Sequence, residues 1–101
     1  MDISVKDLKS RMDSGDTNFF LLDVREPHEH EAFNIGGQLV PVGSLLEAMP
    51  ELADHQEEEV IVYCRSGARS GMAQGILRQA GFKNVRNLTG GMLAWQESIG
   101  G

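Results

Sequence analysis

The chain contains one cysteine, Cys64, and its neighbours are residue types that make a thiol reactive. It follows the apolar run 60–63 and precedes a glycine-centred segment with two arginines, Arg65 and Arg69. Positive charge and unpaired N–H groups at a helix start stabilise an anion, so they favour the thiolate. A free thiol has a pKa of about 8.5, and such surroundings bring it to roughly 3.5–7.5. The pattern therefore predicts that Cys64 is exposed at a strand end, has a lowered pKa and acts as a nucleophile.

The same cationic, amide-rich turn is suited to hold an anionic substrate group over the sulfur. The alternative is that Cys64 is a small buried hydrophobic residue, but such a residue gains nothing from two nearby guanidinium groups. The whole chain has a net charge of −6, with its acidic excess in residues 26–31 and 47–59. An acidic protein with one basic segment predicts a small anionic ligand and argues against a nucleic-acid or anionic-membrane partner.

Three apolar runs predict the strands that position this turn. Residues 19–24 and 60–63 are continuous rather than alternating runs, which is typical of strands covered on both faces. Residues 85–88 form a weaker third strand, residues 39–40 a short fourth, and Ile3 a brief edge strand.

Helical patterns lie between these runs. Helix starts are predicted at a capping box of Ser4 with Asp7, at Pro27, at a box of Ser44 with Glu47 that Pro50 ends, and at Thr89. After the cysteine turn, a helix is predicted with an apolar face of Met72, Ala73, Ile76, Leu77 and Ala80. A Schellman-type end at Gly81 and Phe82 should close it.

Alternating strands and helices predict one α/β domain over residues 1–101. We expect a mainly parallel central sheet of four to five strands with helices on both faces. Ligands of such sheets bind beyond the carboxyl ends of the strands. Asp23 and Cys64 both lie at or near such an end, so we expect them to be close together.

Other polar residues are predicted to be structural. Asp23 beside a thiolate would oppose its ionisation, so we expect it to be bonded to Arg25 or to nearby amides. Gly90 and Gly91 are expected to permit close packing of a helix start, because no lysine follows as it does in a phosphate-binding loop. Trp95 is expected in the core. The three histidines are expected on the solvated surface: His28, His30 and His55.

The single cysteine excludes a disulfide within the chain and a cysteine-based zinc site. The first residues show neither an apolar run nor a cleavage signature, and no segment is long enough to span a membrane. These features predict a cytoplasmic protein.

Three segments together resemble the signatures of single-domain rhodaneses. They are Asp-Val-Arg-Glu-Pro at 23–27, Cys-Arg-Ser-Gly-Ala-Arg-Ser at 64–70 and Leu-Thr-Gly-Gly-Met-Leu-Ala-Trp at 88–95. The resemblance spans nearly the whole chain and implies a sulfurtransferase with a cysteine persulfide intermediate. Cys64 would take sulfane sulfur from a donor such as thiosulfate and pass it to cyanide, a thiol or a thioredoxin-like acceptor, and neither a metal nor an organic cofactor would be needed.

Carried over by position, the resemblance also implies roles for the residues around Cys64. Backbone amides would cradle the persulfide, and the two arginines would hold the anionic oxygens of the donor. The implied substrate-binding residues are Arg65, Ser66, Gly67, Ala68, Arg69 and Ser70, with Asp23 and Arg25 in support. Members of the family commonly have His-Ile-x-Gly-Ala where this chain has Asn-Ile-Gly-Gly-Gln at 34–38, which is expected to alter the pocket rim and acceptor choice.

Two other functions remain open on the sequence. Cysteine phosphatases and arsenate reductases also cradle a thiolate, but their loops place five residues between cysteine and arginine. Here four residues separate Cys64 from Arg69. A smaller ring suits a sulfane sulfur better than a tetrahedral phosphoryl group. The second alternative is a non-enzymatic sulfur carrier or docking module with the same fold.

Overall fold

Four parallel strands form the sheet in the computed structural model, which describes residues 1–100. Their order is β2-β1-β3-β4, and they are β1 (Phe20–Asp23), β2 (Gln38–Leu39), β3 (Glu59–Tyr63) and β4 (Asn84–Asn87). Ile3 adds a parallel bridge to Leu88 beyond β4, so the predicted edge contact is present. The α/β class and the parallel sheet are confirmed.

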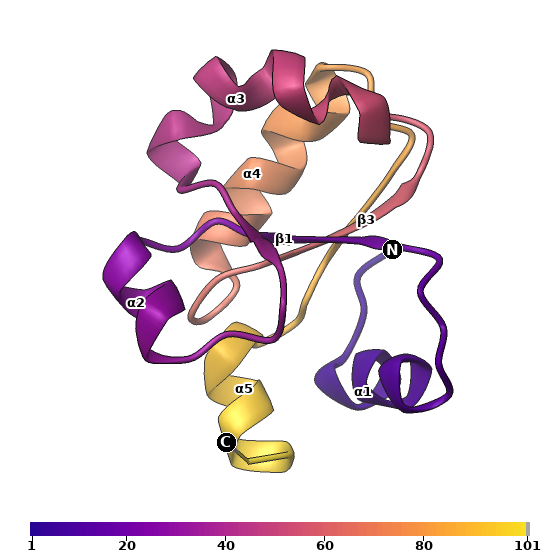
Figure 1. Cartoon of the computed structure of the whole chain (residues 1–101), viewed down its shortest axis with the longest axis vertical. Helices are drawn as coiled ribbons and strands as arrows, with labels where there is room; N and C mark the ends of the chain where they lie inside the picture. Colours follow the sequence, from indigo (N-terminus) through magenta and orange to yellow (C-terminus); the bar gives the residue numbers. More distant parts are fainter. Residues whose placement is uncertain (101) are drawn as a thin grey trace.

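Helices cover both faces of this sheet (Figure 1). One face packs against α3 (Leu45–Leu52) and α4 (Ala68–Gln79), and the other against α1 (Val5–Asp13) and α5 (Gly91–Ser98). Successive residues of β3 serve opposite faces, as a pleated strand requires: Val62 packs under α4, whereas Tyr63 packs toward α5. Trp95 is buried on the α5 side, as predicted.

The remaining elements are short and lie along the connections: α2 (Pro27–Ala32) and the 3-10 turns η1 (Val42–Ser44) and η2 (Ala53–His55). Helix α2 begins at Pro27, as predicted. In Figure 1 it lies beside the loop that joins β3 to α4, at the carboxyl ends of the strands. The predicted Schellman end of α4 is also present, since Gly81 N–H bonds to Arg78 O and Phe82 N–H to Leu77 O, both at 3.1 Å.

Several local predictions were wrong where packing overrode a sequence signal. The side chain of Ser44 makes no cap bond, and Pro50 lies inside α3, because burial of Leu45 and Leu52 holds both ends of that helix. Gly90, in the left-handed region with φ of +79°, takes the N-cap position of α5 predicted for Thr89.

The predicted apolar face of α4 was wrong at one position. Met72 is 63% exposed, whereas Gln74 is buried and donates to Val85 O at 3.0 Å. The helix therefore turns a polar side chain inward, because that amide satisfies a backbone carbonyl of β4.

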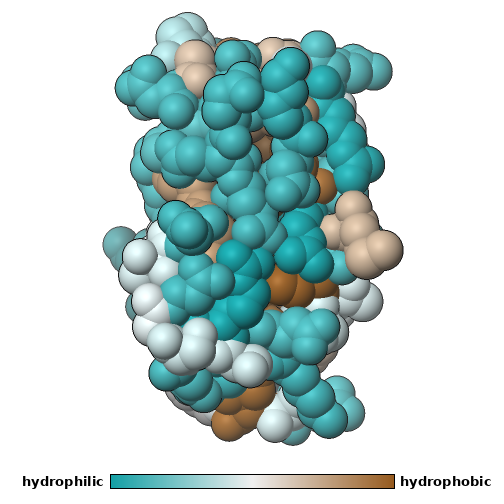
Figure 2. All heavy atoms as spheres, turned by 90° about the vertical axis from the view of Figure 1, so that its right-hand side faces the viewer, coloured by the Kyte–Doolittle hydropathy of each residue, from teal (hydrophilic) through white to brown (hydrophobic). Residues whose placement is uncertain are grey.

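Figure 2 faces the side of the molecule on which the N terminus lies in Figure 1, opposite the β3–α4 loop. That side is largely hydrophilic, with small separate hydrophobic areas. Among residues 1–100 there is no helix with the length and apolar character needed to span a membrane.

Candidate active site

Cys64 lies directly after β3, and its backbone is tied to α5. Its carbonyl accepts a hydrogen bond from Met92 N–H at 2.9 Å, which ties it to the first turn of α5. In the sheet register Asp23 of β1 pairs with Tyr63. Asp23 and Cys64 thus leave adjacent parallel strands at the same sheet edge, as predicted from the sequence.

Three donors of the following loop point at the sulfur of Cys64. Gly67 N–H lies 3.1 Å from Sγ, and Ser70 N–H and Ser70 Oγ each lie at 3.3 Å. Gly67 has φ of +107°, the left-handed conformation that brings the loop back over the sulfur and begins α4. A ring of N–H donors around one atom is an anion-binding arrangement.

The balance of burial and hydrogen bonding lowers the pKa of Cys64. Burial alone raises the pKa of the thiol, but hydrogen bonds from Ser70 and from the N–H groups of Gly67 and Ser66 outweigh it. The lowered pKa agrees with the prediction, although its leading causes are loop donors rather than guanidinium groups. Arg69 does interact with the thiolate, whose charge helps to raise the pKa of Arg69.

The predicted exposure of the thiol was wrong, since Cys64 is only 1% exposed. The end of a strand determines where the backbone emerges, but here the loop folds over its own first residue. The bonds from Gly67 and Ser70 to Sγ hold that closed shape.

Asn87 supports the ring of donors around Cys64 Sγ, and it was not among the site residues predicted from the sequence. Its Nδ2 donates to Gly67 O at 3.1 Å, and its Oδ1 accepts from Ser70 Oγ at 2.6 Å. The Ser70 hydroxyl has one proton and two acceptors in reach, Asn87 Oδ1 and Cys64 Sγ, so Asn87 competes for the proton that the thiolate uses. Its position at the end of β4, a strand next to β3, was the available signal.

The two loop arginines have different surroundings. Arg65 is exposed beside the cysteine, and its carbonyl accepts from Leu93 N–H at 2.9 Å. Arg69 forms a two-pronged ion pair with Glu29 of α2, at 2.7 and 2.9 Å. Ser66 and Ala68 are exposed on the outer side of the loop. No pattern in the sequence indicates this pairing, because Glu29 lies 40 residues from its partner.

Asp23 is fully buried and held by Arg25, as predicted. Its Oδ1 accepts from Arg25 N–H and Nε at 3.0 and 2.9 Å, and its Oδ2 accepts from Nη2 at 2.8 Å. His30 Nδ1 lies 2.8 Å from Oδ2, so the prediction that His30 is a solvated surface residue was wrong. Burial raises the pKa of Asp23, but the bonds from Arg25 and His30 outweigh it and leave the value lowered.

His55 is also not simply solvated, because its ring stacks on Phe20 at 3.7 Å and its Nδ1 lies 2.9 Å from Glu58. His28 is exposed, as expected. Within the described residues, no group of three or more His, Cys, Asp or Glu side chains is arranged to hold a metal ion.

Gly91 allows α5 to approach the cysteine loop, which agrees with the sequence prediction of close packing. A Cβ on Gly91 would lie 2.4 Å from Cys64 O and 2.7 Å from Arg65 O. Its φ of +56° is also in the left-handed region. No larger residue fits there without moving the loop backbone.

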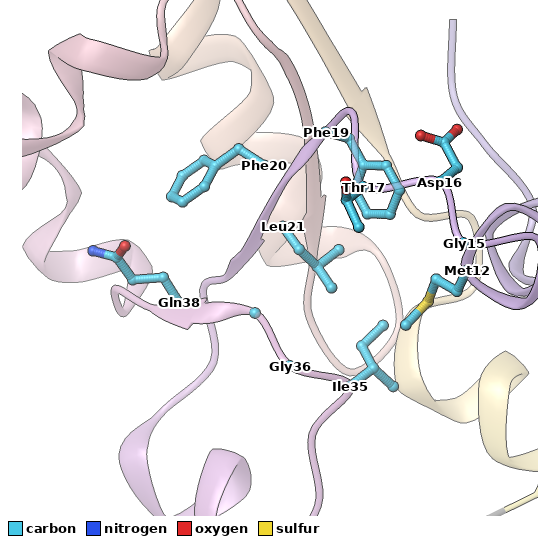
Figure 3. Close-up of a pocket in the computed structure, with 11 residues that line it drawn as sticks. Met12, Gly15, Asp16, Thr17, Phe19, Phe20, Leu21, Ile35, Gly36 and Gln38 are labelled. Atoms are coloured by element: carbon cyan, nitrogen blue, oxygen red, sulfur yellow. The ribbon is translucent and has the colours of Figure 1, made fainter.

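A cavity of about 530 Å³ lies elsewhere, beside the sheet edge at β1 and β2 (Figure 3). Leu21, Ile35 and Met12 point into it from different segments. Residues 35–38, part of the segment that departs from the family pattern, line it. Among its lining residues Asp16 is the ionisable one, and Asp16 is paired with Arg11 at 2.9 Å. The lining therefore includes no unpaired acidic or basic side chain.

Comparison with known proteins agrees with the fold and with the family resemblance of the sequence. Residues 4–98 match the model of the Rhodanese-like domain. Over 89% of this chain and 72% of its own length, the Schizosaccharomyces pombe protein "Putative thiosulfate sulfurtransferase, mitochondrial" is 40% identical. The Bacillus subtilis "Putative sulfur carrier protein YrkF" is 37% identical over 93% of this chain, which spans half of that relative's length. A human single-domain sulfurtransferase shares the fold with a TM-score of 0.82 and 28% identity, over 96% of both chains.

Proposed function

The chain belongs to the rhodanese-like domain family, and we propose that it is a sulfurtransferase in which Cys64 carries the sulfur as a persulfide. The observation that supports this most is the convergence of Gly67 N–H, Ser70 N–H and Ser70 Oγ on Cys64 Sγ. Donors placed around one sulfur stabilise a thiolate before reaction and a persulfide anion after it.

The proposed reaction has two steps. The Cys64 thiolate attacks the sulfane sulfur of a donor such as thiosulfate, an S–S bond forms to Cys64, and the donor's S–S bond breaks as sulfite leaves with its electron pair. An acceptor, cyanide or a thiol, then attacks the outer sulfur and the Cys64 thiolate leaves. No electron source and no cofactor is required by this sequence of steps.

In this proposal the residues of the cysteine loop have different roles. Amides of Ser66, Gly67 and Ser70 hold the charged sulfur, while Arg65 attracts the anionic part of the donor. Ala68 and Arg69 belong to the same loop and begin the helix that fixes it. Asp23 and Arg25 support the neighbouring strand end from their buried pair.

A sulfur-carrier role within a larger pathway is the second candidate. One relative is named as a sulfur carrier, and the thiol of this chain is buried, which is suited to protecting a persulfide between two partners. We treat residues 1–101 as one domain in a reducing compartment such as the cytoplasm, because a free thiolate persists there. A thiol or thioredoxin-like protein is the proposed acceptor.

Turnover tests the proposal. Purified protein with thiosulfate and cyanide should produce thiocyanate repeatedly, and Cys64→Ser should reduce this to the uncatalysed rate. A carrier would take up sulfur without turning over with small acceptors, and would release it to a thioredoxin-like protein. Thiocyanate production by Cys64→Ser that equals wild type and exceeds the uncatalysed rate, or a wild type that takes up no sulfur, would contradict both forms of the proposal.

A further inference from the structure

The Glu29 carboxylate occupies both terminal nitrogens of Arg69. Glu29 Oε1 lies 2.7 Å from Nη1 and Oε2 lies 2.9 Å from Nη2, the paired geometry with which a guanidinium also holds other planar anions. Oε1 additionally accepts the N–H of Glu26 at 3.0 Å, so the first turn of α2 fixes the carboxylate in this position. The side chains are 17% and 32% exposed, and the pair lies at the rim of the molecule.

Protonation of Glu29 does not break this pair near neutral pH. The bond from Arg69 lowers the pKa of Glu29 to about 2, against a smaller opposing effect of burial. Glu29 is therefore ionised at neutral pH, and an anionic donor has to compete with its carboxylate for Arg69.

The pair also changes the charge of the site from what the sequence indicates. Arg69 is neutralised by Glu29, and Arg25 by Asp23. Arg65 remains as the exposed cation beside Cys64, with no salt bridge among residues 1–100. The net positive charge available to a donor is thus about one rather than two.

We propose that Glu29 is a specificity-determining residue, which competes with the donor for Arg69 and makes the site favour sulfane donors with at most one negative charge over dianionic thiosulfate. Alkyl persulfides are the class of donor that fits. This inference rests on the proposed sulfur transfer to Cys64 and adds which donor that site accepts.

The chemistry balances for such a donor. The Cys64 thiolate attacks the outer sulfur of R–S–SH, the new Cys64 S–S bond forms, and the donor's S–S bond breaks with its electron pair leaving on the thiolate R–S⁻. The single negative charge passes from Cys64 to the leaving group, so this step needs no second guanidinium. With thiosulfate the departing sulfite carries two negative charges. Because Arg69 is bound to Glu29, Arg65 alone is available to stabilise them.

The test compares Glu29→Gln with wild type on two donors, thiosulfate and the persulfide of 2-mercaptoethanol. The rate constant for loading one sulfur on Cys64 is measured by intact mass at short times. We expect Glu29→Gln to load from thiosulfate about tenfold faster, a factor that corresponds to about 1.4 kcal/mol. Loading from the persulfide, which carries at most one negative charge, should change by less than about threefold.

Two controls separate this from general charge and folding effects. Glu31→Gln removes the same charge from the same helix, and Glu31 is exposed, so it should leave both rates near wild type. In an Arg69→Ala background, Glu29→Gln should have no further effect on thiosulfate. A Glu29→Gln variant with an unchanged donor preference, or with both rates reduced alike, would overturn the inference. A wild type that neither donor loads would instead contradict the proposed function beneath it.

Discussion

The cysteine loop (residues 64–70) and the sheet-edge cavity differ in the feature that allows chemistry. The cavity is roomy and lined mainly by apolar side chains, with its one ionisable residue, Asp16, already paired. The loop leaves Cys64 only 1% exposed, yet three donors converge on its sulfur. The candidate reactive group therefore lies where N–H and O–H donors converge, and not in the open cavity.

The two regions are also held in place differently. The loop follows β3, which has strands on both sides, and its network reaches β4 through Asn87 and α5 through Gly91. The cavity borders β1 where its edge partner β2 is only Gln38–Leu39. We therefore expect equivalent substitutions to cost more stability near the loop than near the cavity.

The largest difference is expected for aspartate substitutions. Asp23→Asn removes the charge opposite buried Arg25 and should cost about 3–5 kcal/mol of unfolding free energy, because it leaves a buried cation unpaired. Asp16→Asn at the cavity weakens a partly exposed pair and should change stability little. Urea denaturation of both variants at pH 7 makes the comparison. Equal losses of unfolding free energy would show that the region around the cysteine loop is no more sensitive to substitution than the region around the cavity.

A smaller difference is expected for two glycines that both have positive φ. Gly91→Ala adds a Cβ 2.4 Å from Cys64 O, and we expect a loss of about 3 kcal/mol through overpacking and backbone strain. Gly15→Ala at the cavity has φ of +82° but no atom within 4 Å of the new Cβ, so only strain of about 1–2 kcal/mol applies. Thermal unfolding distinguishes them, and a Gly91→Ala variant no less stable than Gly15→Ala would contradict the close approach of α5.

The smallest expected effect is on the ionisation of Cys64. Because its pKa is lowered, thiolate is present near neutrality and is lost only as pH falls through that lowered value. Iodoacetamide alkylation against pH should have a midpoint below that of a free thiol, about 8.5. Ser70→Ala should move the midpoint upward, because it removes the hydroxyl donor 3.3 Å from Sγ.

Leu93→Ala, on α5 next to the loop, serves as the control for this titration, since its side chain is partly exposed and it meets the loop through its backbone. A wild-type midpoint at or above the free-thiol value, unmoved in Ser70→Ala, would reject activation by the loop donors.

The sheet could be predicted from the sequence because continuous apolar runs are a strong local signal of buried parallel strands. The end of α4 was equally predictable, since Gly81 is free to take positive φ. The prediction that Pro50 ends its helix was wrong. The tendency of proline to end a helix is weaker here than the stabilisation from burying Leu45 and Leu52 at the two ends of α3. Local rules succeeded where the chain's own neighbours decide the conformation.

The position of Cys64 and of its loop at the end of β3 was predictable, and the contacts around them were less so. Cys64 and the loop follow from spacing within seven residues, but the bonds of Glu29 to Arg69 and of His30 to Asp23 depend on how α2 packs. The burial of the thiol could not be predicted either. The end of a strand indicates where the backbone lies, but not how the following loop covers the side chain. Pairings of this kind require the tertiary structure.

The measurement that tests the central claim most directly is the intact mass of the protein after incubation with sulfane donors, followed by peptide mapping. Wild type should gain the mass of one sulfur atom on the peptide that contains Cys64, and excess thiol or cyanide should remove it. Cys64→Ser should gain nothing. An unmodified wild type across thiosulfate and alkyl persulfides, or an adduct that persists in Cys64→Ser, would contradict the account.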